Sequence, residues 1–227
     1  MSRTASRATT TRLNEAVPTP AGVTRGEPAA PPPDADAALL ARLAALGDEG
    51  AEIWRRFDRE VRRHEFHPFV PADYGLVLQV LLALRAPGLR FLEWGSATGV
   101  ITIMADLLGF EAYGIELDPE LVEIARGLAG RFGSGARFAS GSFLPAGYAW
   151  RPRTGDGRTG TIGAGASGYD ELRHPLDDFD LVYAYPWDGE EPMMHDLLRD
   201  RGRPGARLLL HGGIEGMRVY RGATREL

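Results

Sequence analysis

Residues 90–118 constrain the fold more than any other stretch of the chain. A short apolar run leads into a turn bracketed by Gly95 and Gly99, and the residues that follow are apolar on most sides of a helix. Gly109 is typical of a helix end, and residues 112–117 have the composition of a buried parallel strand. The stretch therefore predicts a strand, a glycine turn, a buried helix and a second strand.

The turn and the end of the second strand predict a ligand site. Gly95 has no Cβ, so a ligand can approach the backbone closely there. A helix that begins near Thr98 directs unpaired N–H groups at the turn, which suits a carboxylate or a phosphate. Glu116 follows Gly95 by 21 residues, the spacing of a carboxylate that binds ribose hydroxyls. These features indicate a cofactor with a nucleoside and an anionic group.

The motif around the turn separates two classes of cofactor. A dinucleotide site requires G-x-G-x-x-G, whereas the run from Gly95 is G-S-A-T-G, so a nicotinamide enzyme is the weaker alternative. Glu93-x-Gly95-x-x-x-Gly99 resembles motif I of the class I S-adenosylmethionine (SAM) dependent methyltransferases. Residues 114–119 resemble the second-strand motif of that family, and the resemblance covers residues 70–221.

The resemblance implies a Rossmann-like sheet of mostly parallel strands and assigns cofactor contacts residue by residue. Ala97 stands where many members have glycine. Ser142 stands where many members have an aspartate that binds the adenine, so a backbone N–H or the Phe143 ring is the alternative adenine contact. The implied cofactor-binding residues are Glu93, Gly95, Ser96, Ala97 and Gly99 around the methionine part, Glu116 at the ribose with Leu117 next to it, and Ser142 and Phe143 at the adenine.

Composition excludes several kinds of chemistry. The 227 residues include no cysteine and no lysine, which excludes disulfides, thiol nucleophiles, cysteine zinc sites and lysine general bases. A net charge of −5 gives no indication of a nucleic-acid partner, although a local basic patch is compatible with that total. With no apolar run long enough to span a bilayer, a cytoplasmic protein is expected.

The chain divides into three parts. Residues 1–33, rich in Pro, Ser, Thr and Arg, predict a disordered tail. Residues 34–88 predict N-terminal helices: one ends at Gly47, a second follows it, and a third starts at Pro71. Residues 89–227 predict the SAM-binding core, forming one globular unit with these helices.

The second half of the core should complete the sheet. Residues 145–175 include a glycine-rich run, read as an insertion or a mobile loop, with no helical periodicity before Tyr169. Residues 181–184 predict a fourth strand beside the first, and residues 206–213 predict the fifth. Residues 217–221 predict one last, antiparallel strand. The family usually continues with another helix and a seventh strand, and we expect an abbreviated far edge without room for both.

Candidate catalytic residues follow the fourth and fifth strands. Tyr185 and Trp187 can present aromatic rings to a sulfonium, Asp188 belongs to an acidic cluster, and His211 is a candidate general base, as is His195. His64 and His67 have the spacing of a metal pair but no third ligand nearby, so no metal site is predicted.

The predicted function is methyl transfer from SAM to an unidentified acceptor. A small-molecule acceptor is preferred because the sequence contains no second recognition domain. The alternative is a noncatalytic SAM-binding or protein-interaction module on the same fold. The sequence leaves the oligomeric state and the identity of the acceptor open.

Overall fold

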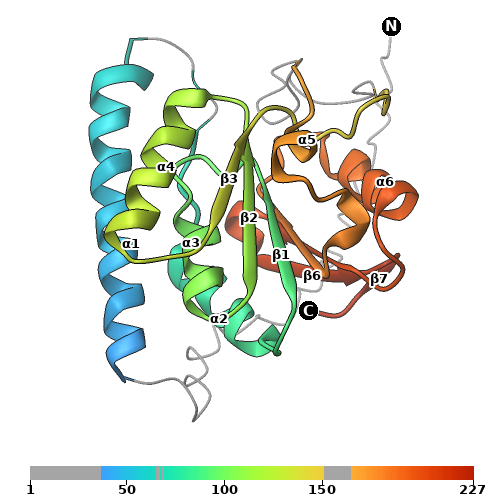
Figure 1. The fold of residues 1–227 in the computed structure, drawn as a ribbon, viewed down its shortest axis with the longest axis horizontal. Coiled ribbons are helices and arrows are strands. Elements are labelled where there is room, and N and C mark those ends of the chain that lie inside the picture. The colour runs from blue at the N-terminus through green and yellow to red at the C-terminus, as the bar shows by residue number, and fades with distance from the viewer. Residues whose placement is uncertain (1–36, 65–66, 68, 151–164) are drawn as a thin grey trace, which may run out of the picture.

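A seven-stranded sheet with helices on both faces forms the molecule (Figure 1). The computed structural model describes residues 37–64, 67, 69–150 and 165–227. The strand order is β3-β2-β1-β4-β5-β6-β7; the first five strands are parallel and the last two antiparallel, which confirms the mostly parallel α/β sheet. The strands are β1 (Arg90–Trp94), β2 (Glu111–Glu116), β3 (Arg137–Ser140), β4 (Leu181–Ala184), β5 (Arg207–His211), β6 (Met217–Arg221) and β7 (Thr224–Arg225).

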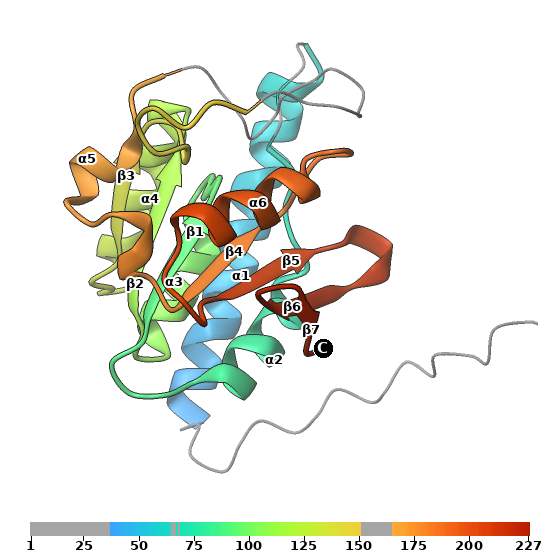
Figure 2. The same ribbon diagram turned by 90° about the vertical axis from the view of Figure 1, so that its right-hand side faces the viewer.

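Two apolar cores lie on opposite faces of the sheet, because successive strand side chains point to opposite sides. Phe91 of β1 packs with the first four helices, whereas Leu92 packs with the last two. Figures 1 and 2 show these helix layers on either side of the sheet. The helices are α1 (Ala37–Phe57), α2 (Tyr74–Leu84), α3 (Val100–Leu107) and α4 (Pro119–Arg131) on one face, and α5 (Gly168–Leu172) and α6 (Glu191–Arg201) on the other.

The topology creates a crevice at the carboxyl end of β1. Trp94 at that end is in register with Ile115 of β2 and with Ala184 of β4, so the predicted pairing of the fourth strand with the first is confirmed. The chain runs outward from β1 to β3 and then returns to β4 on the other side of β1. Such a reversal of direction opens a crevice at the carboxyl edge, where open α/β sheets bind ligands.

The N-terminal helices differ from the prediction. Residues 37–57 form one continuous helix, so the expected break at Gly47 is wrong. A Cβ on Gly50 would lie 2.6 Å from Cγ2 of Val100, and a Cβ on Gly47 would lie 3.8 Å from the Tyr74 ring. The glycine at position 50 therefore serves the close approach of α1 to α3 rather than the end of a helix.

These two glycines give a matched pair of stability predictions. Gly50→Ala should lower the free energy of unfolding by roughly 1–3 kcal/mol, because its methyl group would overlap Val100. Gly47→Ala should raise it by up to about 1 kcal/mol, because alanine is the better helix former and its methyl group meets only ordinary contact. Urea denaturation of both variants measures the difference. Equal effects of the two substitutions would contradict the proposed packing of Gly50.

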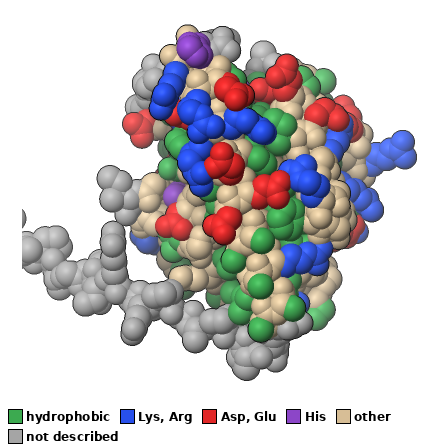
Figure 3. All heavy atoms as spheres, turned by 90° about the vertical axis from the view of Figure 1, so that its left-hand side faces the viewer, with side chains coloured by type: hydrophobic (Ala, Val, Ile, Leu, Met, Phe, Trp, Pro, Cys, Tyr) green, Lys and Arg blue, Asp and Glu red, His purple; other side chains and the backbone are tan. Residues whose placement is uncertain are grey.

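The segment between α1 and α2 contains a π-helical stretch and the residue that caps α2. A π-helical segment, Asp58–Arg62, follows α1 directly. Asp73, rather than Pro71, begins α2, since its carboxylate accepts the Leu76 N–H at 3.0 Å. Figure 3 shows acidic and basic side chains intermixed on the exposed side of the molecule along α1, as expected for a solvated helix face.

The far edge of the sheet is short. Between β5 and β6 the chain forms only a 3₁₀ turn, Gly213–Glu215, and β6 is antiparallel to β5 as predicted. A seventh strand is nevertheless present, which corrects the expectation: the two-residue β7 pairs with Tyr220 and Arg221. The predicted tail at 1–33 and most of the glycine-rich run, 151–164, lie outside the described residues. Within the described ranges, no helix combines the length and the apolarity needed to cross a membrane.

Candidate functional site

The turn between β1 and α3 is a tight loop of left-handed residues. Gly95, Ala97 and Gly99 have φ values of 73°, 44° and 75°. The N–H groups of Gly95 and Ser96 both donate to the carbonyl of Ile115, at 2.9 and 3.0 Å, which holds the turn against β2. The helix α3 then begins at Val100 with Gly99 as its N-cap. The predicted turn is therefore present, and its backbone lies at the carboxyl edge of the two central strands.

Two glycines leave room for this loop. A Cβ at Gly99 would lie 2.6 Å from the Phe138 ring and 2.8 Å from Cβ of Ala125. A Cβ at Gly114 in β2 would lie 2.7 Å from both Cβ and Oγ of Ser96. The glycine at 114 therefore lets Ser96 pack directly over the second strand.

Glu93 is a buried carboxyl group that links β1 to α3. Its side chain is 4% exposed, and its Oε2 accepts the N–H of Thr102 at 2.9 Å and also the Thr102 hydroxyl. Burial raises the pKa of Glu93 to about 8, against the lowering effect of these hydrogen bonds. Glu93 therefore carries a proton over much of the neutral range.

Glu116 stands at the carboxyl end of β2 and joins two backbone segments. Its Oε2 accepts the N–H of Ala97 at 2.8 Å, and its Oε1 accepts the N–H of Asp118 at 3.0 Å. Burial raises its pKa, opposed by the hydrogen bonds from these backbone groups. Each carboxylate oxygen has a second lone pair, so both retain capacity to accept ligand hydroxyls. The adjacent Leu117 side chain is 38% exposed and is among the exposed large apolar groups of the chain.

A shallow pocket that is open to solvent lies beside the turn. Residues 69–74 form one wall, the turn and the start of α3 form another, and β4 contributes the rest. Phe69 and Tyr74 both line it. The lining consists of Phe69, Val70, Pro71, Ala72, Tyr74, Glu93, Gly95, Ser96, Ala97, Thr98, Val100, Ile101, Tyr183 and Tyr185.

Tyr183 is a lining residue that the sequence analysis missed. It lies in an apolar strand and reads as core, but Tyr183 and Tyr185 are two residues apart and so share one face of the strand. In the β1–β4 pairing Tyr183 is directly in register with Glu93. The spacing of two residues between Tyr183 and Tyr185 is the sequence signal that could have identified Tyr183 as a lining residue.

His211 lies behind the pocket wall. Its Nε2 faces the N–H of Asp73 at 3.2 Å, its Nδ1 faces the N–H of Gly213 at 3.2 Å, and it is absent from the pocket lining. A neutral imidazole has one acceptor nitrogen, so it bonds only one of these donors at a time. Burial lowers the pKa of His211, opposed by Asp73. The ring packs 4.4 Å from the Tyr185 ring and so supports the pocket wall, while its role as a general base stays a prediction.

The other catalytic candidates separate into one pocket residue and three that lie elsewhere. Tyr185 lines the pocket, as predicted. Trp187 and Asp188 are not among the lining residues; Asp188 is exposed, and the Trp187 N–H donates to Glu190 at 3.0 Å. His195 packs 4.6 Å from the Tyr220 ring and 3.7 Å from Glu191. Tyr185 thus lines the pocket without Trp187 and Asp188, and the catalytic roles of all three residues stay predictions.

The predicted adenine contacts are also partly corrected. The Phe143 ring is 2% exposed and stacks on Trp94 at 5.1 Å, within the core beneath α5 and α6. It is therefore packed on the face of the sheet opposite Glu116. Ser142 is buried, and its Oγ accepts the N–H of Leu144 at 3.1 Å, so its side chain stabilises its own loop.

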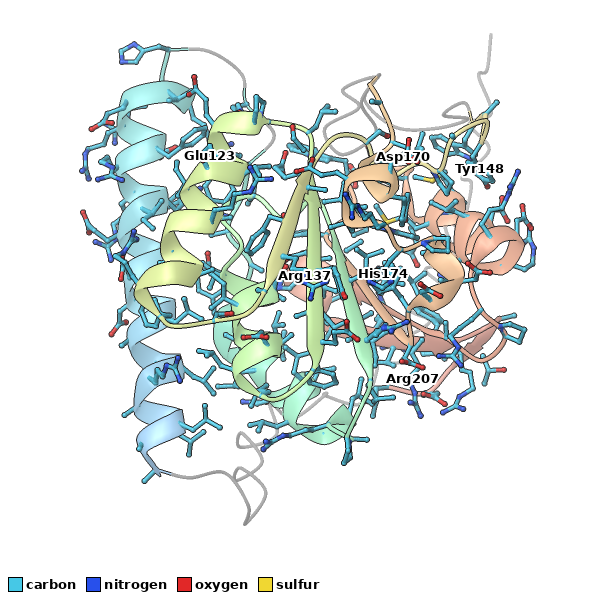
Figure 4. All side chains as sticks on the ribbon, in the orientation of Figure 1. Glu123, Arg137, Tyr148, Asp170, His174 and Arg207 are labelled. Carbon is cyan, nitrogen blue, oxygen red and sulfur yellow. The ribbon has the colours of Figure 1, made fainter. Side chains whose placement is uncertain are left out.

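Polar groups away from the pocket have structural partners. His67 bonds Asp118 at 3.1 Å rather than forming a pair with His64. Figure 4 shows Arg137 and His174 on the α5 side of the sheet, where His174 contacts the Tyr113 hydroxyl at 3.0 Å and Asp178 at 2.8 Å. Across the described part of the chain, no group of three or more His, Asp or Glu residues is arranged to hold a metal ion.

Sequence comparison relates the chain to methyltransferases. No protein-family model matches it. It is 33% identical over 130 residues to the ribosomal protein L11 methyltransferase of Ralstonia nicotianae, and 37% identical over 67 residues to that of Thermus thermophilus. The first match includes 57% of this chain and 34% of the relative, and the second includes 30% and 26%. The chain thus spans about a third of the length of these curated relatives.

Solved methyltransferase structures are also similar to this one. An RNA methyltransferase from Salinibacter ruber in complex with S-adenosyl-L-homocysteine (SAH) has a TM-score of 0.44 and 19% identity, covering 62% of this chain and 76% of that chain. A SAM-dependent methyltransferase from Thiobacillus denitrificans in complex with SAH has a TM-score of 0.41 and 20% identity, covering 70% and 54%. The sequence matches confirm the resemblance to methyltransferases that the motif at 93–99 predicted.

Proposed function

We propose that this protein is a SAM-dependent methyltransferase. The observation that carries the proposal is the carboxylate of Glu116, held at the end of β2 by the N–H of Ala97 from the glycine turn. A carboxylate in this place binds the two ribose hydroxyls of a nucleoside, while the turn surrounds the methionine part. Leu117, exposed beside Glu116, supplies an apolar surface for the adenine. The sequence similarity to methyltransferases supports the same cofactor.

The chemistry proposed is an in-line displacement at the SAM methyl group. The acceptor atom attacks the methyl carbon as the bond from that carbon to sulfur breaks, and the sulfur keeps the bonding electrons. Because the methyl group is already activated, holding both reactants in line can supply on the order of 7–11 kcal/mol of the acceleration in favourable cases. Tyr185, the predicted catalytic residue that lines the pocket, is placed to position the reacting groups.

For the acceptor, we propose a small molecule. The pocket beside the turn is partly covered by residues 69–74, which leaves a small opening beside Tyr185. A protein acceptor is the second candidate, because the curated relatives are named for methylation of ribosomal protein L11. SAH formation measured with a panel of small amines, alcohols and acids, and separately with purified L11, distinguishes the two. Turnover with L11 alone would overturn the small-molecule proposal.

A noncatalytic SAM-binding module is the alternative from another class. The enzyme and the noncatalytic module are both expected to bind SAM, so only the formation of SAH distinguishes them. Calorimetric titration with SAM, SAH and NAD should give heat with the first two and none with NAD. SAM binding without SAH formation across the whole acceptor panel would favour the noncatalytic alternative. Absence of binding by SAM and SAH to the folded protein would refute the proposal itself.

The ribose assignment gives a specific prediction. Glu116→Ala should weaken SAM binding roughly 10- to 100-fold, because charge-assisted hydrogen bonds to the ribose are lost and Ala97 loses its partner. Glu120→Ala, an exposed carboxylate in the first turn of α4, is the control and should bind SAM normally. Calorimetry with both variants measures the change. Unchanged affinity in Glu116→Ala would falsify the ribose assignment.

A further inference from the structure

His211, at the carboxyl end of β5, joins three segments that are distant from one another in the sequence. The residue is 4% exposed. Its Nε2 faces the N–H of Asp73, the residue that caps α2, and its Nδ1 faces the N–H of Gly213 in the turn that follows β5. Its ring packs against Tyr185, which directly follows β4. One buried imidazole therefore holds the start of α2 and the ends of β4 and β5 together.

The segments that His211 joins form part of the pocket wall. Residues 69–72 and Tyr74, on either side of Asp73 in the sequence, line the pocket, and so does Tyr185. The turn after β5 stands behind the same tyrosine, since a Cβ built on Gly213 would lie 3.7 Å from the Tyr185 hydroxyl oxygen. A change in the contacts of His211 therefore acts on two parts of the wall at once.

The hydrogen-bonding capacity of the ring does not match the two groups that face it. Both ring nitrogens of His211 lie 3.2 Å from a backbone nitrogen that carries a hydrogen, at Asp73 and at Gly213. A neutral imidazole has one N–H group and one nitrogen with a lone pair, whereas the imidazolium has two N–H groups and no acceptor. The neutral ring therefore accepts from one backbone group in each tautomer, and the protonated ring accepts from neither.

The surroundings of His211 favour the neutral ring. Burial lowers the pKa of His211, and the carboxylate of Asp73 opposes this effect. The other titratable and charged groups on the neighbouring elements are the Tyr185 hydroxyl after β4, Glu215 in the turn after β5 and Arg218 on β6. Glu215 is 73% exposed and lies 3.8 Å from Arg218, so these two charges offset each other. The folded arrangement is therefore that of an uncharged imidazole.

We propose that His211 is a pH-sensitive latch that holds the start of α2 and the turn after β5 against Tyr185. In its neutral form, the ring shares one lone pair between the N–H groups of Asp73 and Gly213 by exchanging its two tautomers. Protonation removes the lone pair and releases both backbone groups. The latch makes His211 a positioning residue of the pocket wall. Its effect on the two backbone groups is independent of the proposed function, whereas its effect on ligand binding rests on that function.

Two substitutions at position 211 separate the halves of the latch. The side-chain oxygen of asparagine takes the place of Nδ1 in a histidine, and the side-chain oxygen of glutamine takes the place of Nε2. His211→Asn should therefore retain the acceptor for the Gly213 N–H and lose the one for Asp73, and His211→Gln should do the reverse. Neither amide side chain titrates, so both variants should also remove the dependence on pH.

Amide hydrogen exchange followed by NMR, and corrected for the intrinsic effect of pH on exchange, measures each contact directly. In the unmodified protein, we expect the protection of the Asp73 and Gly213 amides to fall roughly 3- to 10-fold as the pH decreases from about 7.5 to about 5.5. In His211→Asn only Gly213 should stay protected, and in His211→Gln only Asp73. The Gly168 N–H, which donates to the Ser142 carbonyl at 2.9 Å beside α5, is the internal reference.

A second histidine and a ligand complete the experiment. His195→Gln removes an imidazole that packs against Tyr220 instead, so the pH dependence of the Asp73 and Gly213 amides should persist in that variant. Calorimetry with SAH then measures the effect on the pocket. The affinity of the unmodified protein, relative to that of His211→Gln, should decrease as the pH is lowered, because only the unmodified protein releases residues 69–72 from the latch.

The latch and the proposed function fail through different results. Protection of the Asp73 and Gly213 amides that stays constant with pH in the unmodified protein would overturn the latch, and this measurement requires no variant. A dependence on pH that persists in both His211→Asn and His211→Gln would overturn it as well. Failure of SAH to bind at every pH would instead refute the proposed function, and the exchange measurements would still decide whether His211 acts as a latch.

Discussion

Replacing Gly99 with alanine is expected to lower the free energy of unfolding by roughly 2–5 kcal/mol. Two costs add at this position. Its φ of 75° is strained for any residue with a side chain, and its Cβ would lie 2.6 Å from the Phe138 ring and 2.8 Å from Ala125. Neither neighbour yields easily, because Ala125 and Phe138 are themselves buried in the core. Urea denaturation with linear extrapolation measures the loss.

Gly88 provides the control that separates the two costs. Its φ is 74°, almost equal to that of Gly99, but nothing lies within 4 Å of a Cβ built on it. Gly88→Ala should therefore show the backbone strain alone, about 1–2 kcal/mol. Equal destabilisation by the two substitutions would show that the contact of a Cβ at position 99 with Phe138 adds nothing to the loss of stability.

The second large effect concerns pH and Glu93. Burial raises the pKa of this carboxyl from 4.5 to about 8, so between these values the folded protein retains a proton that the unfolded chain releases. The stabilisation from this group is complete below about pH 4.5 and is lost as pH rises through about 8. The loss follows a slope of at most about 1.4 kcal/mol per pH unit, which gives about 4 kcal/mol over three units as an upper bound.

Glu93→Gln isolates this effect, because the amide has nearly the same shape and does not titrate. The difference in unfolding free energy between the variant and the unmodified protein should shift in favour of the variant as pH rises from 5 to 8. Other carboxyl groups titrate in both proteins and cancel in the difference. A difference that stays flat with pH would show that Glu93 titrates normally in the folded protein.

Local patterns predicted the centre of the fold. The glycines at 95, 99 and 109 and the apolar runs between them specify the first strand–helix–strand unit without reference to distant residues. The helix α1 was divided in error at Gly47, because a glycine inside the helix, which packs near the distant Tyr74, was interpreted as a helix end. A glycine that serves close packing has the same local sequence signature as one that ends a helix.

The sequence motif predicted the site residues that lie on the glycine turn and at the end of β2. It was less informative for residues whose position depends on which face of a strand they occupy. The placement of Glu116 at the end of β2 and its bond to the turn follow from the motif. Phe143 was assigned to the ligand, but its position relative to β3 places the ring under α5, opposite the site. Tyr183 was missed because its register with Glu93 depends on the pairing of β1 with β4.

The double attachment of Glu116 has a consequence for how the site can vary. One carboxylate links two backbone segments, the turn after β1 at Ala97 and the loop after β2 at Asp118. In the proposed binding mode, the contact with the sugar and the shape of the turn around the methionine part therefore depend on the same side chain. We expect a substitution that shifts either segment to shift the other, so that sugar preference and sulfur placement change together in such variants.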